Sequence, residues 1–230
     1  MTNTLSERTK LKTGLKLQMV FGTGFIAKLG YNTNVIQKEV LHMTTKSKFT
    51  TRKIVFIALM AALTCVGSAI RVTLPLDIAG TTSFHLGNIF CALSGILLGP
   101  WAGGMAAGLG SAIYDMTNPL YISECWITFL MKGAYGVAAG LMARSFLKEG
   151  YFKDILSAIC GALTYAVLYL AKSYFYGGLL VSGLTPDAAW GVVLGKIPAT
   201  IFNICVAVIF APILATTLRK ALKRNHLTLE

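Results

Sequence analysis

The stretch "LYLAKSYFYGG", residues 168–178, places Lys172 inside a run that is otherwise apolar enough for the interior of a lipid bilayer. The surrounding apolar segment, about residues 154–179, is longer than the roughly 20 residues that a helix needs to cross a membrane. An ammonium group at the middle of such a helix costs about 3 kcal/mol even on lenient insertion scales. We therefore expect Lys172 to face a partner or a water-filled space rather than lipid.

The composition of the whole chain supports a membrane protein. Of 230 residues, 55% are hydrophobic and 13% are charged, and the mean hydropathy is +0.65, whereas soluble domains have about 25% charged residues. The formal net charge of +12 raises the question of a nucleic-acid partner. No DNA- or RNA-binding motif accompanies the basic residues, so we expect no nucleic acid to bind.

Six apolar segments predict an all-α, polytopic membrane protein with six transmembrane helices. The segments cover about residues 53–72, 84–98, 101–117, 124–146, 154–179 and 189–217. The second and third are short for a bilayer, and "LLGPW" between them leaves room only for a tight turn, because Pro100 breaks the helix. These two segments are predicted to form a helical hairpin.

The orientation follows from the rule that cytoplasmic loops carry the excess of lysine and arginine. With a cytoplasmic N-terminus, three basic groups lie inside: Lys46, Lys48, Arg52 and Lys53; Arg144, Lys148 and Lys153; Arg219, Lys220, Lys223 and Arg224. The outer loops then hold Arg71, Asp77, Glu124 and Asp187. We predict that both termini are cytoplasmic and that the protein crosses the bacterial plasma membrane several times.

The N-terminal segment, residues 1–42, differs from the six-helix domain, residues 43–230. It is basic and polar, and its apolar patch "MVFGTGFIA" is too short to span a membrane. The sequence "KEVLHM", Lys38 to Met43, permits codons that resemble a bacterial ribosome-binding site followed by a start codon. We hypothesise that translation begins at Met43; a disordered tail or an amphipathic surface helix are the alternatives.

Three lysines are predicted to lie at one depth in the membrane. Lys132, Lys172 and Lys196 each stand seven or eight residues from the predicted outer end of their segment. At 1.5 Å per residue this places all three roughly 10–12 Å below the outer boundary. Three cations in one layer indicate a cavity open to the outside, since isolated lysines would extend to the nearest interface. The alternative is structural: Lys132 would pair with Glu124 or Asp115, and Lys172 or Lys196 would reach water beside Asp187.

Aromatic, amide and carboxylate groups near this layer complete the candidate substrate-binding site. Besides the three lysines, we select Asp115, Asn88, His85, Tyr169, Tyr176 and Trp126. Such groups bind planar organic solutes, although tyrosine and tryptophan also gather at membrane interfaces without a ligand. The five cysteines and three histidines are scattered, so neither a metal site nor a cofactor is expected.

Two stretches carry a resemblance to a known family. "FHLGNIFCALSGILLGPWAGGMAAGLGSAIYDMTNP", residues 84–119, and "ITFLMKGAYGVAAGLMA", residues 127–143, resemble the substrate-binding S components of energy-coupling factor (ECF) vitamin transporters, especially the riboflavin-type branch. The similarity covers about residues 50–220. It implies that Ala58 and Ala62, an A-x-x-x-A pair, dock onto a transmembrane T component, and that a vitamin lies beneath the loop at residues 71–83.

The resemblance also implies a function. The chain would capture a vitamin or vitamin precursor from outside and deliver it inward with the T component and two cytoplasmic ATPases. It has no phosphate-binding G-x-x-x-x-G-K-[ST] loop of its own. The alternatives are a stand-alone secondary carrier or, less favoured, an intramembrane enzyme using Asp115, Glu124 or a lysine; no nucleophile-and-base motif supports an enzyme.

The cargo stays open at this stage. Three lysines favour a carboxylate or phosphate compound such as pantothenate or nicotinate. The branch resemblance favours riboflavin, or a pyrimidine or pyridoxine precursor, and cobalamin is a further candidate. Since one fold serves several cargoes, the resemblance does not choose between them.

Overall fold

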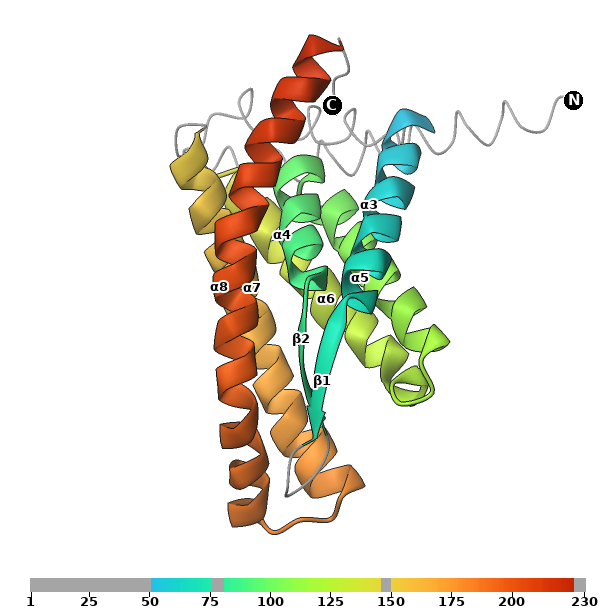
Figure 1. Cartoon of the computed structure of the whole chain (residues 1–230), viewed down its shortest axis with the longest axis vertical. Coiled ribbons are helices and arrows are strands. Elements are labelled where there is room, and N and C mark those ends of the chain that lie inside the picture. Colours follow the sequence, from blue (N-terminus) through green and yellow to red (C-terminus); the bar gives the residue numbers. More distant parts are fainter. Residues whose placement is uncertain (1–50, 76–80, 146–149, 226–230) are drawn as a thin grey trace, which may run out of the picture. The chain divides into compact units, whose positions relative to one another are not determined.

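The computed structural model describes residues 51–75, 81–145 and 150–225. The segment 1–42, and with it the hypothesis of a start at Met43, lies outside these residues. In chain order the elements are α3 (Thr51–Ala69), β1 (Arg71–Pro75), β2 (Thr81–His85), α4 (Gly87–Leu98), α5 (Pro100–Thr117), η1 (Ile122–Glu124), α6 (Cys125–Ala143), α7 (Tyr151–Lys172), η2 (Ser173–Val181) and α8 (Pro186–Arg224). Figure 1 shows them as a helical bundle with a short β-hairpin.

Each of the six predicted apolar segments corresponds to a helix. Four helical stretches of the described chain are long and apolar enough to cross a membrane: Thr51–Ala69, Ile122–Ala143, Tyr151–Val181 and Pro186–Arg224. By contrast α4 has 12 residues and covers only about 18 Å. The all-α membrane architecture is therefore present, but the prediction of six full spans is not confirmed for α4 and α5.

The turn between α4 and α5 forms where "LLGPW" predicts it. Gly99 adopts a φ of 79°, a left-handed conformation that favours glycine, and its N–H donates to the Gly95 carbonyl at 2.9 Å. Pro100 begins α5, where its missing N–H costs nothing. Arg144, which directly follows α6, donates from Nη2 to the Leu98 carbonyl at 3.3 Å, so a carbonyl group at the C-terminal end of α4 has a hydrogen-bond partner.

A β-hairpin occupies the region that we expected to be a loop, residues 71–83. Strands β1 and β2 pair antiparallel, with Arg71 opposite His85 and Thr73 opposite Ser83. This corrects the all-α prediction locally, since the described residues include this two-stranded sheet. The three threonines and the valine of these strands suit a β conformation, but a hairpin of this length is stable only when it packs against other elements.

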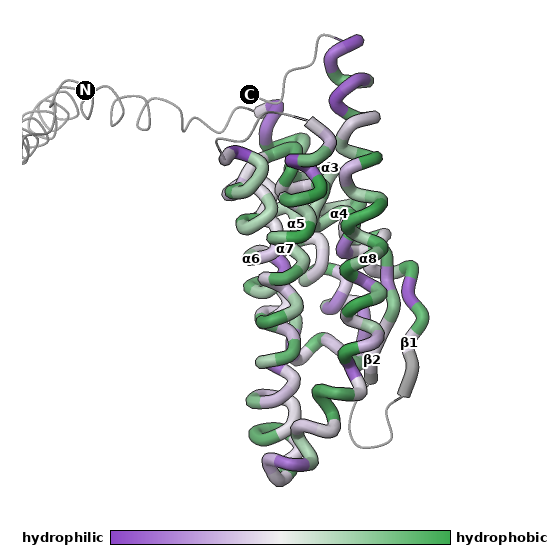
Figure 2. The backbone as a smooth tube through the Cα atoms, turned by 90° about the vertical axis from the view of Figure 1, so that its left-hand side faces the viewer, coloured by the Kyte–Doolittle hydropathy of each residue, from purple (hydrophilic) through white to green (hydrophobic). Residues whose placement is uncertain are grey.

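Helix α4 lies at the centre of the bundle and packs against α3, α5, α6, α7 and α8. Cys91, Ala92 and Leu93 are almost completely buried. The outer helices instead expose large apolar side chains such as Leu163 and Val167, as expected where lipid surrounds them. Figure 2 shows this hydrophobic colouring along the middle of α8, with hydrophilic residues at its C-terminal end.

Glycines let α4, α5 and α6 approach closely. A Cβ on Gly136 of α6 would lie 2.7 Å from the Gly103 carbonyl oxygen of α5, and a Cβ on Gly95 of α4 would lie 2.5 Å from the Gly136 carbonyl oxygen. Both distances are shorter than van der Waals contact. Small residues at such crossings let the helix backbones pack closely. The resulting van der Waals contacts hold the helices together where lipid provides no hydrophobic driving force.

Two glycines of α6 give a matched test of this packing. Gly136→Ala should destabilise the bundle by about 1–3 kcal/mol, because the added methyl group meets backbone atoms that cannot move aside. Gly133→Ala should leave stability unchanged or raise it slightly, since its nearest neighbour would be 3.6 Å away and alanine favours the helix. Thermal unfolding in detergent measures both variants; equal melting temperatures would contradict the close crossing.

Candidate functional site

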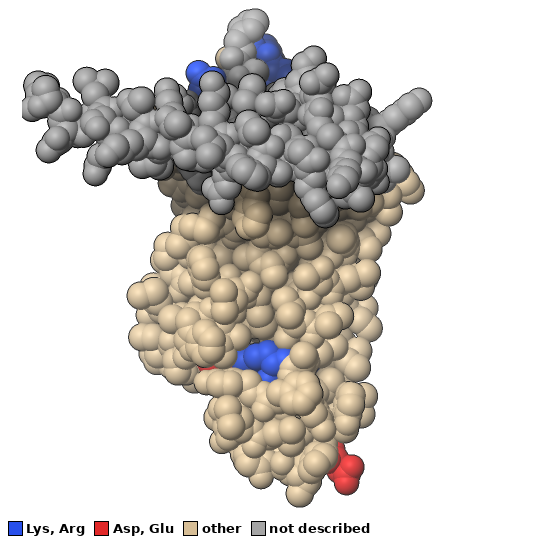
Figure 3. Space-filling view, turned by 180° about the vertical axis from the view of Figure 1, so that it is seen from behind, with Lys and Arg blue, Asp and Glu red and all other residues tan. Residues whose placement is uncertain are grey.

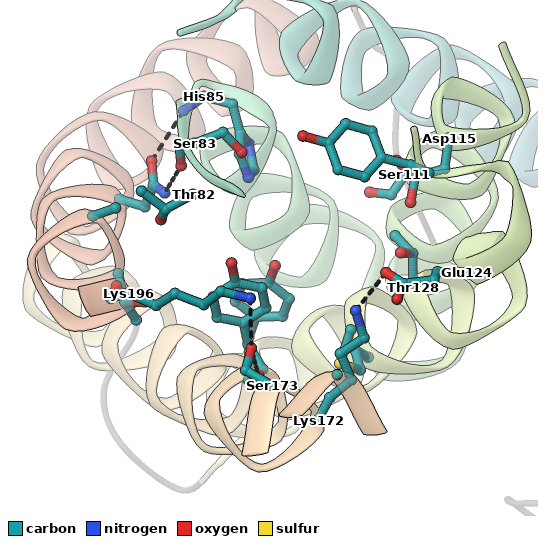
Figure 4. A pocket seen from close by; sticks show the side chains of 18 of the residues that line it. Thr82, Ser83, His85, Ser111, Asp115, Glu124, Thr128, Lys172, Ser173 and Lys196 are labelled. Atoms are coloured by element: carbon teal, nitrogen blue, oxygen red, sulfur yellow. Dashed lines mark hydrogen bonds and ion pairs between the residues drawn. The ribbon is translucent and has the colours of Figure 1, made fainter. Parts of the chain in front are cut away.

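One cavity of about 300 Å³ opens between the β-hairpin and the helices. Figure 3 shows basic side chains at the bottom of an opening on the face of the bundle opposite that of Figure 1. Figure 4 shows the interior. The polar and aromatic residues that line it include Ser68, Arg71, Thr82, Ser83, His85, Asn88, Ser111, Asp115, Tyr121, Ser123, Glu124, Thr128, Lys132, Tyr165, Tyr169, Lys172, Ser173, Lys196, Thr200 and Asn203.

Most of the predicted site residues meet at this cavity. Its lining includes Lys132, Lys172, Lys196, Asp115, Asn88, His85 and Tyr169. Tyr176 is outside the lining, although its ring centroid is 5.7 Å from the Lys172 nitrogen. Trp126 is also outside the lining and is 58% exposed, which matches the alternative interpretation of a membrane-interface aromatic residue.

Lys132 projects from α6 into the interior and is only 3% exposed. Its Nζ donates a hydrogen bond to the Asn88 side-chain oxygen of α4. The same nitrogen lies 3.9 Å from the ring centroid of Tyr165 on α7, a cation–π distance. Neutral groups of two other helices therefore hold this ammonium.

Lys172 forms an ion pair with Glu124. This matches the structural alternative for one lysine, with a different partner assignment, since we considered Glu124 as a partner of Lys132. The pair joins the end of α7 to η1, directly before α6, and Figure 4 shows it at the cavity. Both side chains are partly accessible, at 16% and 27%.

Lys196 extends from α8 along one side of the cavity, with its nitrogen directed toward Ser173 (Figure 4). It is 9% exposed, and its Nζ donates to the Ser173 hydroxyl at 3.3 Å. The Tyr169 ring centroid is 5.5 Å away. Within the described residues, the ion pairs are Lys172–Glu124 and Arg219–Asp154, so Lys196 has no carboxylate partner there.

Three tyrosines form a stack beside the two buried lysines. The ring centroids of Tyr135 and Tyr165 are 5.9 Å apart, and those of Tyr165 and Tyr169 are 5.7 Å apart, with nearly parallel planes. Tyr165 and Tyr169 are four residues apart and share one face of α7. This spacing could identify them in the sequence, whereas Tyr135 on α6 was missed.

Arg71 is a further cationic residue of the cavity that the sequence analysis placed only in an outer loop. Its Nε donates to the Ser68 carbonyl at 3.1 Å. The guanidinium lies over the rings of Tyr114 and Tyr121, at 4.5 Å and 4.7 Å from their centroids. Its position at the outer end of the first apolar segment is the signal that could have indicated it.

The β-hairpin is attached to α8 by Asn203, which the sequence analysis did not select. The His85 backbone N–H donates to the Asn203 side-chain oxygen at 3.1 Å, and the Asn203 amide donates to the Ser83 carbonyl at 2.9 Å. Phe84 adds an edge-to-face contact with Phe202 at 5.0 Å between centroids. These contacts make β2 one wall of the cavity.

A metal-binding role finds no support in the described part of the chain, where no three His, Cys, Asp or Glu side chains gather closely enough to hold an ion. The chemistry of the cavity is instead that of recognition by ammonium, guanidinium, hydroxyl, amide and phenol groups.

The apolar helices around a polar cavity define a multi-pass membrane protein. Comparison with protein families makes the assignment specific: the model of the "ECF-type riboflavin transporter, S component" matches residues 48–220. The chain belongs to this family of vitamin-transporter components, which act in the plasma membrane. The resemblance seen in the sequence is thereby confirmed.

Two relatives are similar over much of their length. A "Probable biotin transporter BioY" from Lysinibacillus sphaericus is 28% identical over 183 residues, 75% of this chain and 89% of the relative. An uncharacterized protein from Pyrococcus woesei is 27% identical over 148 residues, 59% of this chain and 95% of the relative.

Asn203→Ala tests the attachment of the hairpin. The substitution leaves the His85 N–H and the Ser83 carbonyl without their partner, which should cost about 1–3 kcal/mol. We expect a lower melting temperature and faster hydrogen exchange at the His85 amide. Asn225→Ala, at the exposed end of the same helix, is the control, and unchanged exchange at His85 would contradict the attachment.

Proposed function

We propose that this S component captures a vitamin or vitamin precursor from outside the cell, holds it in the cavity, and delivers it inward together with a T component and two cytoplasmic ATPases. The observation that carries the proposal is the cavity itself. It collects cationic, hydroxyl and tyrosine side chains from the hairpin and several helices of an otherwise apolar bundle. Buried polar groups are costly in such a bundle unless they have partners, and a bound solute would supply them.

The distribution of basic residues supports the proposed orientation. The start of α3 and the end of α8 lie at the end of the bundle opposite the hairpin (Figure 1). Arg52 and Lys53 begin α3, and Lys223 and Arg224 end α8. By the positive-inside rule this end is cytoplasmic, so the cavity beside the hairpin faces the outer half of the membrane.

We propose that the predicted residues lining the cavity contact the solute: Lys132, Lys172, Lys196, Asp115, Asn88, His85 and Tyr169. Tyr176 then acts indirectly, by its contact with Lys172. The cavity volume of about 300 Å³ is at the small end of the range of roughly 300–1,000 Å³ for small-molecule sites. This favours a compact vitamin over a corrinoid such as cobalamin.

The docking face for the T component is proposed on α3. Ala58 and Ala62 are exposed and lie four residues apart on one face, while Ile57, Met60 and Ala61 are buried against the other helices. A small-residue face on an outer helix permits the close approach of a second membrane helix.

The proposal is tested by separating binding from transport. The purified full chain in detergent should bind one or more of riboflavin, biotin, pantothenate, nicotinate and pyridoxine without any partner. Uptake of the bound compound by cells should require co-expression of the T component and catalytically active ATPases. Uptake by the chain alone would identify a stand-alone carrier and would contradict the proposal.

Ala62→Trp tests the docking face. The indole would keep the T-component helix from approaching, so uptake should fall at least about tenfold while the dissociation constant of the purified chain stays unchanged. Leu163→Trp, on the exposed face of α7, is the matched control and should transport normally. Lost solute binding with normal assembly of the complex would contradict the assignment of Ala58 and Ala62.

A further inference from the structure

We infer that the solute of this cavity is a small organic anion whose carboxylate lies against Lys196. The inference rests on the proposed function and adds the chemical class of the cargo. An anionic solute would differ from riboflavin, the neutral vitamin for which the family is named. The inference follows from the charged side chains of the cavity and from their partners.

The cavity carries more positive than negative charge. Four cationic side chains line it, Arg71 and the three lysines, against two carboxylates, Asp115 and Glu124. With His85 counted as neutral, the difference is 4 − 2 = +2. An excess of cations enclosed by low-dielectric walls attracts anionic solutes.

Three of the four cations have partners that position them firmly. Lys172 has the carboxylate of Glu124. Arg71 has two tyrosine rings and a backbone carbonyl. Lys132 has the Asn88 amide oxygen and the face of Tyr165. These cations shape the cavity and are already engaged.

Lys196 is the least satisfied cation of the cavity. Its ammonium has three N–H groups, yet its hydrogen bond to a side chain is the long one to Ser173 at 3.3 Å. Tyr169 lies farther from it, at 5.5 Å, than Tyr165 lies from Lys132, at 3.9 Å. A buried ammonium of this kind gains most from a bound carboxylate, because unpaired buried charge is costly.

The hydroxyl groups beside Lys196 already donate to backbone carbonyls, so the ammonium is the hydrogen-bond donor that remains for a solute. Ser173 donates its proton to the Tyr169 carbonyl at 2.8 Å, and Thr200 donates to the Lys196 carbonyl at 2.9 Å. Both hydroxyl protons are therefore occupied by backbone oxygens. The hydroxyl groups of Ser173 and Thr200 therefore have no proton to donate to a solute. A carboxylate near Ser173 would accept its hydrogen bond from the Lys196 ammonium.

The tyrosine stack indicates the rest of the solute. Tyr165 and Tyr169 line the cavity and stack at 5.7 Å between centroids. Next to an anchored carboxylate, they offer contacts to a ring or a short apolar chain. The cargo class is therefore a compact carboxylate with such a group, small enough for about 300 Å³.

Pairs of acids and neutral analogues test the charge requirement. Isothermal titration calorimetry on the purified full chain would compare nicotinate with nicotinamide, pantothenate with pantothenol, and biotin with biotinamide, with riboflavin as a neutral reference. We expect at least one acid to bind about 10- to 100-fold more tightly than its analogue, as a charge-assisted hydrogen bond provides.

Lys196→Met should reduce the preference for the acid over its neutral analogue to less than about threefold, mainly because the acid binds more weakly. Lys196→Arg, which retains the charge, should keep most of it. Lys220→Met removes an exposed lysine from the same helix and should bind like the unmodified chain. Thermal unfolding identifies any variant that fails to fold, and the comparison of acids with analogues on the unmodified chain needs no variant.

The outcomes distinguish the inference of an anionic cargo from the proposed function of solute capture. Tighter binding of riboflavin or of a neutral analogue would overturn the anionic cargo and leave solute capture in place. An acid preference that survives Lys196→Met undiminished would overturn the role of Lys196. Failure of the unmodified chain to bind any of the seven compounds would count against the proposed function.

Discussion

Placing charge inside an apolar bundle is the constraint on which the rest of this structure depends. Lys132 and Lys196 are buried, with 3% and 9% of each residue exposed. Each ammonium needs polar partners, because the surrounding apolar helices do not replace the water that it loses on burial. Asn88, the tyrosine stack and the strand β2 provide a polar compartment for them. The glycine contacts among α4, α5 and α6 keep the remaining interior tightly packed.

Features with a fixed geometry were predictable from the sequence. The helical rise of 1.5 Å per residue predicted that Lys132, Lys172 and Lys196 lie at one level of the bundle, and all three line one cavity; their depth in the membrane stays a prediction. Pro100 and Gly99 have backbone preferences strong enough to define the turn between α4 and α5. That the lysines contact a solute remains a prediction.

Features that depend on long-range pairing could not be predicted. Strands β1 and β2 lie where a loop was expected, and β2 is held by Asn203, 118 residues beyond His85. Glu124 pairs with Lys172 rather than Lys132, a choice that depends on how α6 and α7 rotate about their axes. The exposure of Trp126 depends on the same rotation, because helical spacing alone does not state which face meets a neighbour.

Helix α8 carries Lys196, Thr200 and Asn203 at intervals of four and three residues, which places them along one stripe. Lys196 lines the cavity, and Asn203 forms hydrogen bonds with strand β2, which is one wall of the cavity. One helix thus carries both the lysine that we propose binds the carboxylate and the asparagine that holds the strand forming one wall of the cavity. Because these two residues lie seven positions apart, about two helical turns, a displacement of this segment of α8 would shift both the ammonium and the strand attached to it.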